Sequence, residues 1–488
     1  MQQSSSAGNL ADTLRRDLRH YSEGEKLPSN RALMERYQVS PVTVSRAIAV
    51  LVAEGAVTSR PGAGVFRVVP HAGPEPSGDV SWQEVALSAG SGSGSDSGPA
   101  AGSPRGPDAS GLLATLATPP LDVIDLNGGY LHPSLQPERA LAGALARAGR
   151  RPGTWDRPPV EGIADLRAWF ARDIAGADGA LAGADVLITA GGQSALTTAL
   201  RSLTAPGAAV LVESPTYPGT LAVARAAGLR PVPVPVDADG VRTDLLEEAF
   251  HATRARVFVC QPLFQNPTGT TLSPERRLEV LRIARAAGAF VVEDDFARRL
   301  AHAGSSPLPQ PLAAQDPDGV VVHIRSLTKA TSPNLRVGAL TARGPAMERL
   351  RASQVVDSFF VPRPLQETAL ELVGSPAWRS HLRALADTLR SRRDAMVTAL
   401  RQELPDLLGE RIPQGGYHLW LRLPAGADER ALAATALRAG VAVTPGRPYF
   451  AAEPPAPYLR LSYISAANTD QLREGIRQLR RTIAEVCH

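Results

Sequence analysis

The chain has 488 residues, of which 43% are hydrophobic and 20% are charged, and its formal net charge is +4 at pH 7. This composition indicates a globular protein of about two to four domains and excludes a fully disordered, collagenous or coiled-coil protein. Its two cysteines are too few for a disulfide framework or a four-cysteine metal site, and no run of about 18 apolar residues predicts a membrane-spanning helix.

The positive charge is concentrated near the N-terminal end of the chain. Residues 1–67 contain nine Lys or Arg and six Asp or Glu, so +3 of the net +4 lies there. Such an excess is a mild indication of nucleic-acid binding. Residues 1–9 are polar and lack the charged and apolar segments of a signal peptide, so we expect a cytoplasmic protein.

The first elements predicted along the chain are three helices. Leu10, Leu14 and Leu18 recur every four residues and give a first helix one apolar stripe. Ser29 is a suitable N-cap for a second helix that runs to Tyr37. The apolar face of a third helix is formed by Val44, Ala47, Ile48 and Leu51.

The third helix has the features of a DNA-reading element. Ser40 is its predicted cap and Pro41 its first residue. The face opposite the apolar one begins with Val42, Thr43, Ser45 and Arg46. A small, polar N-terminal face with one arginine suits the major groove of DNA.

Two strands at residues 56–60 and 65–68 follow, joined by Pro61-Gly62-Ala63-Gly64. Glycines in such a hairpin let the backbone approach phosphates, and Arg60 adds charge. The helix pattern alone leaves a small helical bundle with a hairpin as an equal alternative to a winged helix-turn-helix.

The middle of the chain has the composition of a linker. In residues 71–110, 28 of 40 positions are Gly, Ser, Pro or Ala. The stretch therefore has too few apolar side chains to form a folded core. As a random coil this stretch spans roughly 35 Å. We therefore divide the chain into a first domain at residues 1–69, a flexible linker at 70–117 and a main domain at 118–488.

The main domain alternates short apolar strands with helical stretches, which predicts an α/β fold with a mainly parallel sheet covered on both faces. The predicted strands are residues 186–189, 210–212, 257–259, 290–292 and 320–324. Ligands of such folds bind at the carboxyl ends of the strands.

Lysine is rare in this sequence, which makes its positions informative. Of 52 basic residues only Lys26 and Lys329 are lysines. Guanidinium groups stay protonated and do not form Schiff bases, whereas a lysine amine does. Lys329 follows the predicted strand that ends at Ile324, so it lies at the ligand-binding edge. The alternative, an ordinary surface lysine, is weak in a chain that otherwise uses arginine.

A lysine that binds an aldehyde cofactor such as pyridoxal phosphate needs several partners. Ala190-Gly191-Gly192-Gln193 opens a helix after a strand and suits a phosphate, with Ser326 and Arg336 available to complete the cradle. The ring nitrogen needs a carboxylate, and Glu293-Asp294-Asp295 ends another strand. A strand cap or a solvated turn is the alternative for these acids.

Two further residues suit the ring of such a cofactor. Tyr217, after the strand that ends at Glu213, suits the ring face, and Asn266 suits the ring hydroxyl. In isolation these are an ordinary loop tyrosine and a plain Asn-Pro turn. His132, His323 and His418 are scattered, so we expect no metal site.

The first domain closely resembles the GntR-type DNA-binding domain. The resemblance rests on Lys26-Leu27-Pro28-Ser29-Asn30-Arg31, on residues 39–47 and on residues 60–66, and it covers nearly all of residues 9–67. It implies a winged helix-turn-helix, and it gives Lys26 a place in a turn. The expected DNA-facing residues are Arg31, Ser40, Thr43, Ser45, Arg46, Arg60 and Gly62.

The main domain resembles fold-type I aminotransferases, with a large and a small subdomain. The resemblance rests on residues 190–196, 213–219, 266–269, 292–295 and 326–338, and it covers roughly residues 121–488. It implies bound pyridoxal phosphate with Lys329 as the Schiff-base lysine, Asp294 at the ring nitrogen and Tyr217 stacked on the ring. It also implies Asn266 at the ring hydroxyl and Gly192, Gln193, Ser326 and Arg336 around the phosphate.

Two further positions bear on this resemblance: Arg460 agrees with the family pattern and Phe296 departs from it. Residues 457–462 are similar to the segment whose arginine binds a substrate carboxylate, which implies that role for Arg460. A strand-edge surface charge is its alternative. The family usually has a tyrosine after the acidic residues, where this chain has Phe296, so full transaminase chemistry is in doubt.

The order of the parts resembles the MocR subfamily of bacterial GntR-type regulators. It implies a homodimer that binds operator DNA under the control of pyridoxal phosphate, alone or with an amino acid or amine. One alternative is a true aminotransferase with an appended DNA-binding domain. A second alternative is a DNA-binding protein whose main domain is only a dimerisation scaffold, and the intact pair of Lys329 and Asp294 argues against it.

Overall fold

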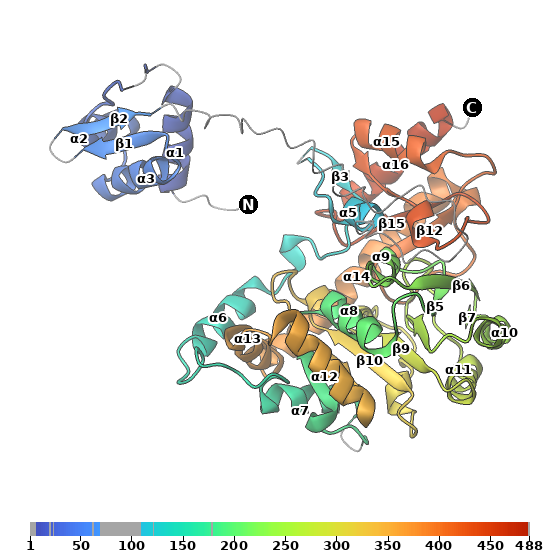
Figure 1. Cartoon of the computed structure of the whole chain (residues 1–488). Coiled ribbons are helices and arrows are strands. Elements are labelled where there is room, and N and C mark those ends of the chain that lie inside the picture. Colours follow the sequence, from blue (N-terminus) through green and yellow to red (C-terminus); the bar gives the residue numbers. More distant parts are fainter. Residues whose placement is uncertain are drawn as a thin grey trace, which may run out of the picture. The chain divides into compact units, whose positions relative to one another are not determined.

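The computed structural model describes residues 6–18, 21–22, 24–60, 63–68, 109–120, 122–176 and 179–486. The chain divides into two compact units, Met1–Arg105 and Gly106–His488 (Figure 1). Gly62 and the linker up to residue 108 lie outside the described residues. None of the helices in the described ranges combines the length and the apolar character needed to cross a membrane.

The first unit is the predicted winged helix-turn-helix. Its elements are α1 (Ser6–Asp17), α2 (Asn30–Tyr37), α3 (Pro41–Ala53), β1 (Val57–Arg60) and β2 (Gly64–Arg67), with β1 and β2 antiparallel. The predicted caps form, because the hydroxyl of Ser29 accepts a hydrogen bond from the backbone N–H of Ala32 at 3.3 Å and that of Ser40 accepts one from Thr43 at 3.2 Å. Gln38 ends α2 in the left-handed conformation, with φ of 51°.

The core of this unit consists of the leucine stripe of α1 and the apolar face of α3, as predicted, joined by Leu27, Leu33 and Val57. The exposed Lys26 is paired with Phe66 of β2, and its stem crosses the backbone of Gly64. A Cβ at Gly64 would lie 2.6 Å from Cε of Lys26, so any other residue there would require the flexible lysine side chain to move.

An eight-stranded sheet is the centre of the second unit. Its order is β4-β11-β10-β9-β8-β5-β6-β7, and all strands are parallel except β7 and β11. The strands are β4 (Val186–Thr189), β5 (Ala209–Ser214), β6 (Arg230–Asp237), β7 (Gly240–Val241), β8 (Val257–Cys260), β9 (Phe290–Asp294), β10 (Val321–Ser326) and β11 (Gly338–Thr341).

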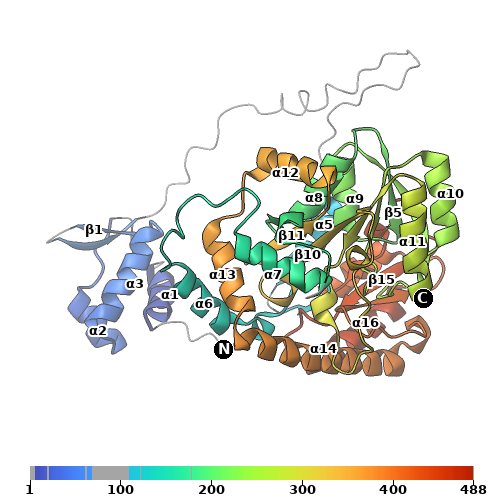
Figure 2. The same cartoon turned by 90° about the horizontal axis from the view of Figure 1, so that it is seen from below.

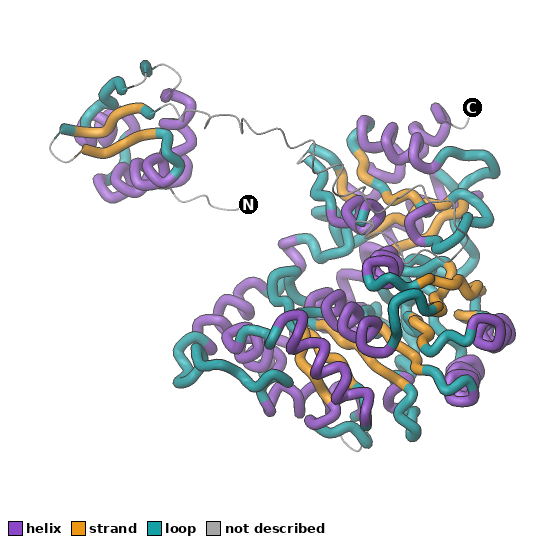
Figure 3. The backbone as a smooth tube through the Cα atoms, viewed as in Figure 1, coloured by secondary structure: helices purple, strands orange, loops and turns teal. Residues whose placement is uncertain are grey.

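Helices cover both faces of this sheet, as the apolar strands require (Figures 2 and 3). One face is covered by α8 (Gly192–Leu203), α9 (Pro218–Ala226) and α12 (Pro345–Ser358). The other is covered mainly by α7 (Ala164–Ala175), α10 (Thr243–Thr253), α11 (Pro274–Ala286) and α13 (Arg363–Val373). A further helix, α6 (Glu138–Ala148), packs against α13.

A smaller sheet forms the predicted second subdomain, with the order β12-β15-β14. Its strands are β12 (His418–Arg422), β14 (Thr444–Pro445) and β15 (Tyr458–Ser462), and β13 (Val441–Ala442) pairs in parallel with β3 (Ile124–Asp125). Its helices are α14 (Pro376–Glu403), α15 (Glu429–Arg438) and α16 (Thr469–Val486).

The structure differs from the predicted end of the linker. Residues 110–116, which we assigned to the linker, form helix α5 (Ser110–Leu116), which packs against α9 in the second unit. Its sequence, Ser-Gly-Leu-Leu-Ala-Thr-Leu, has the small residues of a linker, and of its three leucines Leu113 and Leu116 are exposed and only Leu112 is half-buried. Composition alone therefore places the boundary too late.

We expect replacement of Leu51 by Ala to destabilise the first unit selectively. Leu51 is fully buried between α1 and α3, and loss of such a side chain costs about 2–5 kcal/mol. Calorimetry of the full chain should show a lower transition temperature for the first unit and an unchanged transition for the second. Val52→Ala, at an exposed neighbouring position, is the control. Equal shifts of both transitions would contradict the independence of the units.

Candidate functional site

A pocket lies at the carboxyl edge of the central strands. The structure brings together in it all eight residues that the sequence predicts for a cofactor. They are Gly192, Gln193, Tyr217, Asn266, Asp294, Ser326, Lys329 and Arg336. The other residues of its lining are Tyr130, Leu196, Gln261, Phe296, Thr328 and Tyr417.

Lys329 follows β10 and presents its amine to this pocket. Its Nζ donates a hydrogen bond to the carbonyl of Gly129 at 2.7 Å and lies 4.0 Å from the ring centroid of Tyr130. The ring centroid of Tyr417 is 5.7 Å away. Burial lowers the pKa of the Lys329 amine. More of the amine is therefore unprotonated, which is the form that attacks an aldehyde.

Asp294 is the last residue of β9, and among the described residues no cationic side chain lies within hydrogen-bond distance of its carboxylate. It accepts a hydrogen bond at 2.7 Å from Nε2 of Gln261, whose Oε1 in turn accepts one from the backbone N–H of Asn266 at 3.0 Å. Burial raises the pKa of Asp294 to about 6. A protonated ring nitrogen placed against this carboxylate would offset the cost of its burial.

The loop between β4 and α8 has the form of a phosphate cradle. Gly191 adopts φ of 85°, and a Cβ there would lie 3.1 Å from Cζ of Arg336. Arg336 donates a hydrogen bond to the carbonyl of Ala190 at 2.6 Å. Helix α8 begins at Gly192 without a side-chain cap, so its first N–H groups are free to bind an anion.

Two residues complete the fit to the cofactor ring. Tyr217 is the N-cap of α9, and its hydroxyl lies 3.4 Å from Oε1 of Gln193. Oδ1 of Asn266 is buried and has no hydrogen-bond partner. An unpaired buried acceptor is costly, and a ring hydroxyl would satisfy it. Phe296 lies in the same pocket, edge-on to Tyr417 with ring centroids 6.1 Å apart, and offers no hydroxyl.

Arg460 lies on β15 behind the pocket and is only 2% exposed. It is not part of the pocket lining, and its guanidinium carbon is 6.0 Å from the ring centroid of Tyr417 and 5.6 Å from that of Tyr449. Its Nη2 donates a hydrogen bond to the carbonyl of Asn127, and its Nε has no partner. The alternative of a surface charge is therefore wrong, because the guanidinium is buried.

Glu213, at the end of β5, is a second buried carboxylate near the pocket. It accepts hydrogen bonds from the backbone N–H of Gln261 at 3.0 Å and from the side chain of Gln265 at 3.3 Å. Burial raises the pKa of Glu213 to about 7. Gln261 is thus held by Glu213 and itself holds Asp294, a role that sequence reasoning missed although Gln261 directly follows β8.

The other acids of the Glu293-Asp294-Asp295 run belong to a buried ionic network beside the site. Glu293 accepts a hydrogen bond from Nδ1 of His323 at 2.8 Å, and Asp295 is paired with Arg325 at 2.8 Å and with Arg298 at 2.6 Å. Burial alone would raise the pKa of Asp295, but the guanidinium groups hold it below its usual value. Arginines thus neutralise Asp295, while Glu293 is held by His323 and by the backbone N–H groups of Leu312 and Ala313, and these bonds account for both acids as a structural network.

In the first unit, most predicted DNA-facing side chains are exposed. Ser40, Ser45 and Arg46 lie on the surface at the start of α3, and Arg31 pairs with Glu35 at 3.2 Å. Arg60 lies over the ring of Phe66 on the hairpin, 5.0 Å from its centroid. Thr43 is half-buried, and its hydroxyl is 2.8 Å from that of Ser40.

The two units match two different families. Residues 122–479 match the family described as aminotransferase class I and II, and residues 7–66 match the bacterial regulatory proteins of the gntR family. The chain belongs to the class I and II aminotransferase family. Because it carries a gntR domain at its N-terminus, its architecture is that of the MocR regulators, as the sequence predicts.

Relatives of both kinds resemble this aminotransferase-family chain. It is 33% identical to the 2-aminoadipate transaminase of Thermus thermophilus over 74% of the chain and 90% of that protein. It is 28% identical to the uncharacterized HTH-type transcriptional regulator YisV of Bacillus subtilis over 95% of the chain and 92% of that protein.

The solved structures point to the same cofactor. The structure of LysN, the α-aminoadipate aminotransferase of Thermus thermophilus, complexed with N-(5'-phosphopyridoxyl)-L-leucine, is 31% identical with a TM-score of 0.72. The match covers 78% of this chain and 96% of that one. Together with the family match, it supports pyridoxal phosphate as the cofactor of this fold.

We expect Glu213→Gln to stabilise the cofactor-free protein at pH 8. The pKa of Glu213 rises from 4.5 to about 7 on folding, so the folded chain binds a proton that the unfolded chain releases, and stability falls as the pH rises through this range. Removing the charge should raise the free energy of unfolding by on the order of 3 kcal/mol at pH 8 and by little at pH 4. Urea unfolding at both pH values measures this, with the exposed Glu275→Gln as control. An equal effect of Glu213→Gln at both pH values would contradict the shift.

Proposed function

We propose that this chain is a transcriptional regulator whose DNA binding is controlled by pyridoxal phosphate held on Lys329, alone or together with an amino compound. The observation that carries the proposal is that one chain contains a gntR-family domain and a pocket lined by all eight residues that the sequence predicts for the cofactor. A protein that binds chromosomal DNA in a bacterium works in the cytoplasm.

Each residue of the pocket has a distinct task in this proposal. The cofactor, when bound, supplies an aldehyde and an electron-withdrawing ring. The Lys329 amine, whose pKa is lowered by burial, would hold the cofactor through its aldehyde group, and Asp294 would keep a proton on the ring nitrogen. Arg336 and the N-terminus of α8 bind the phosphate, while Tyr217 covers the ring face.

The amino compound is proposed to carry a carboxylate, because Arg460 is a buried guanidinium with a free Nε beside the pocket. One relative is named for transamination of 2-aminoadipate, and the LysN structure contains a phosphopyridoxyl derivative of L-leucine. These two amino acids are therefore suitable first probes. Differential affinity for two arrangements of a homodimer would change the spacing of the paired DNA readers.

A true aminotransferase is the second candidate, favoured by the 33% identity to a transaminase over 90% of its length. Phe296 argues against it, because this position offers no hydroxyl to the cofactor ring. Steady turnover of an amino acid with a keto acid would support the enzyme. A single, stoichiometric reaction would support the regulator.

We expect Lys329→Ala to abolish the visible absorption band that the purified protein gains with pyridoxal phosphate. Without this amine no covalent link forms. Lys26→Ala, which removes the only other lysine, should retain the full band. A parent protein that is folded but gives no band would leave only a DNA-binding scaffold and would contradict the proposal.

We expect Arg460→Ala to keep the cofactor band and to lose the response to carboxylate-bearing amino acids. DNA binding is measured by fluorescence anisotropy on fragments enriched from a random pool, with and without L-leucine or 2-aminoadipate. The parent's affinity should change about fivefold or more, as is usual for allosteric coupling. A response that survives the substitution would mean that the cofactor itself is the signal.

A further inference from the structure

Helix α5 connects the second unit to the residues that lead from the DNA-binding domain. It is the first element of the second unit in chain order, beginning at Ser110. It has only seven residues and contacts α9 and the short turn Arg447–Tyr449. Any signal that reaches the DNA-binding domain along the chain must pass through it.

The buried Asn127 joins α5 to the carboxylate-binding arginine. Its backbone carbonyl accepts the hydrogen bond from Nη2 of Arg460. Its side-chain amide donates a hydrogen bond at 2.8 Å to the carbonyl of Ala114 in the last turn of α5. Its Oδ1 accepts a hydrogen bond from the hydroxyl of Thr444. Asn127 is 7% exposed, so water does not readily replace these bonds.

The bond to Ala114 matters because the last four carbonyls of a helix have no partner within the helix. Asn127 therefore holds the C-terminal end of a helix too short to be stable by itself. The same residue contacts Arg460, because its backbone carbonyl accepts the hydrogen bond from the guanidinium. A carboxylate bound at the free Nε would draw the guanidinium toward it and so change the geometry of the Nη2 bond to the Asn127 carbonyl.

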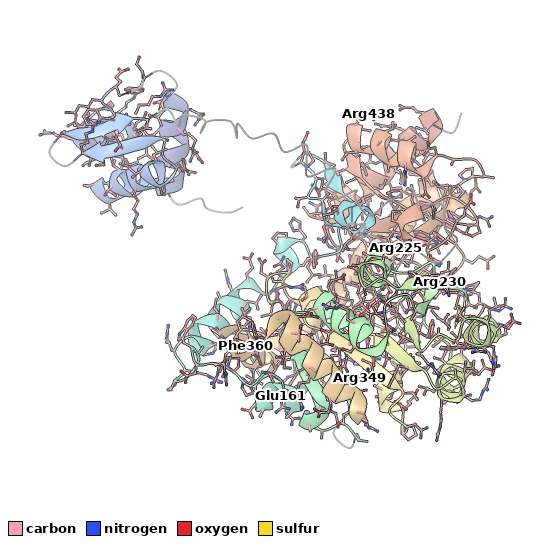
Figure 4. All side chains as sticks on the ribbon, viewed as in Figure 1. Glu161, Arg225, Arg230, Arg349, Phe360 and Arg438 are labelled. Carbon is pink, nitrogen blue, oxygen red and sulfur yellow. The ribbon has the colours of Figure 1, made fainter. Side chains whose placement is uncertain are left out.

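A second contact ties α5 to the same site from its other end. A Cβ on Gly111 would lie 2.9 Å from Cβ of Pro448, so the helix rests directly on this turn. The next residue, Tyr449, lies beside Arg460, and its carbonyl accepts a hydrogen bond at 2.8 Å from the N–H of Thr216, the neighbour of Tyr217. Helix α9 (Pro218–Ala226) begins directly after Tyr217 and contains Arg225, which is labelled in Figure 4.

We propose that Asn127 is a positioning residue that couples the occupancy of Arg460 to helix α5, the first described element after the residues that lead from the DNA-binding domain. The coupling rests on the proposed function, because it requires an amino compound at Arg460. In the free state α5 is fixed by Asn127 and Pro448. In the occupied state the hold on its last turn changes and the helix loosens or shifts.

The experiment compares Asn127→Ala with Leu113→Ala in the cofactor-loaded full chain. The first change removes the bond to Ala114 but keeps the backbone carbonyl that Arg460 uses. The second lies on the same helix at a side chain that is 62% exposed. Absorption spectra report reaction with a panel of the common amino acids and 2-aminoadipate. Hydrogen exchange reports the α5 amides, and anisotropy reports affinity for the enriched DNA.

The expected results distinguish reaction of the amino compound in the pocket from the response of helix α5. The parent and Leu113→Ala should show a spectral change, altered exchange in α5 and a change in DNA affinity of about fivefold or more. Asn127→Ala should keep the spectral change but show exchange in α5 and DNA affinity that no longer respond. Gly111→Val, which forces α5 off Pro448, should give the same uncoupled behaviour and guards against misfolding of the first variant.

Two other outcomes overturn the proposal in distinguishable ways. If amino compounds change the spectrum and DNA affinity of Asn127→Ala and Gly111→Val as they do in the parent, the coupling is wrong and the proposed function stands. If no compound of the panel changes the parent's spectrum, the proposed function fails at the amino-compound step and the coupling fails with it.

Discussion

The burial of Asp294 without a cation is the constraint on which the main domain's site depends. A carboxylate at the end of a central parallel strand is surrounded by covered backbone, and in the described part of the chain only the side-chain amide of Gln261 donates a hydrogen bond to it. Glu213 is buried nearby, and the pKa of each acid is raised by this burial. Lys329 lies in the same pocket, and burial likewise disfavours its charged form, which lowers the pKa of its amine. The pocket is thus arranged for a ligand that brings both a cationic ring nitrogen and an anionic phosphate.

Much of this arrangement can be predicted from the sequence, because the reactive and polar residues directly follow the apolar runs that predict strands. Lys329, Asp294 and the Gly191-Gly192 turn each follow an apolar run, and a parallel sheet brings such ends together. The same logic identifies the caps Ser29 and Ser40. Local rules of this kind need no knowledge of distant contacts.

The parts that escaped prediction depend on contacts between distant segments. Tyr130 and Tyr417 approach Lys329 from opposite ends of the domain, and neither belongs to a motif on its own strand or helix. The depth at which Arg460 is buried follows from the packing of the small sheet, which no spacing reveals. Helix α5 was hidden by its linker-like composition, since its structure depends on α9 and Asn127 rather than on its own residues.

The scarcity of lysine has a practical consequence that follows from where the two lysines lie. Lys26 crosses the hairpin of the DNA-binding domain in the open, and Lys329 lies in the pocket of the other unit. A chain grown with isotope-labelled lysine therefore carries one spectroscopic reporter in each unit, without any substitution. Nuclear magnetic resonance of these two signals would follow the DNA-binding domain and the pocket around Lys329 separately in the same sample.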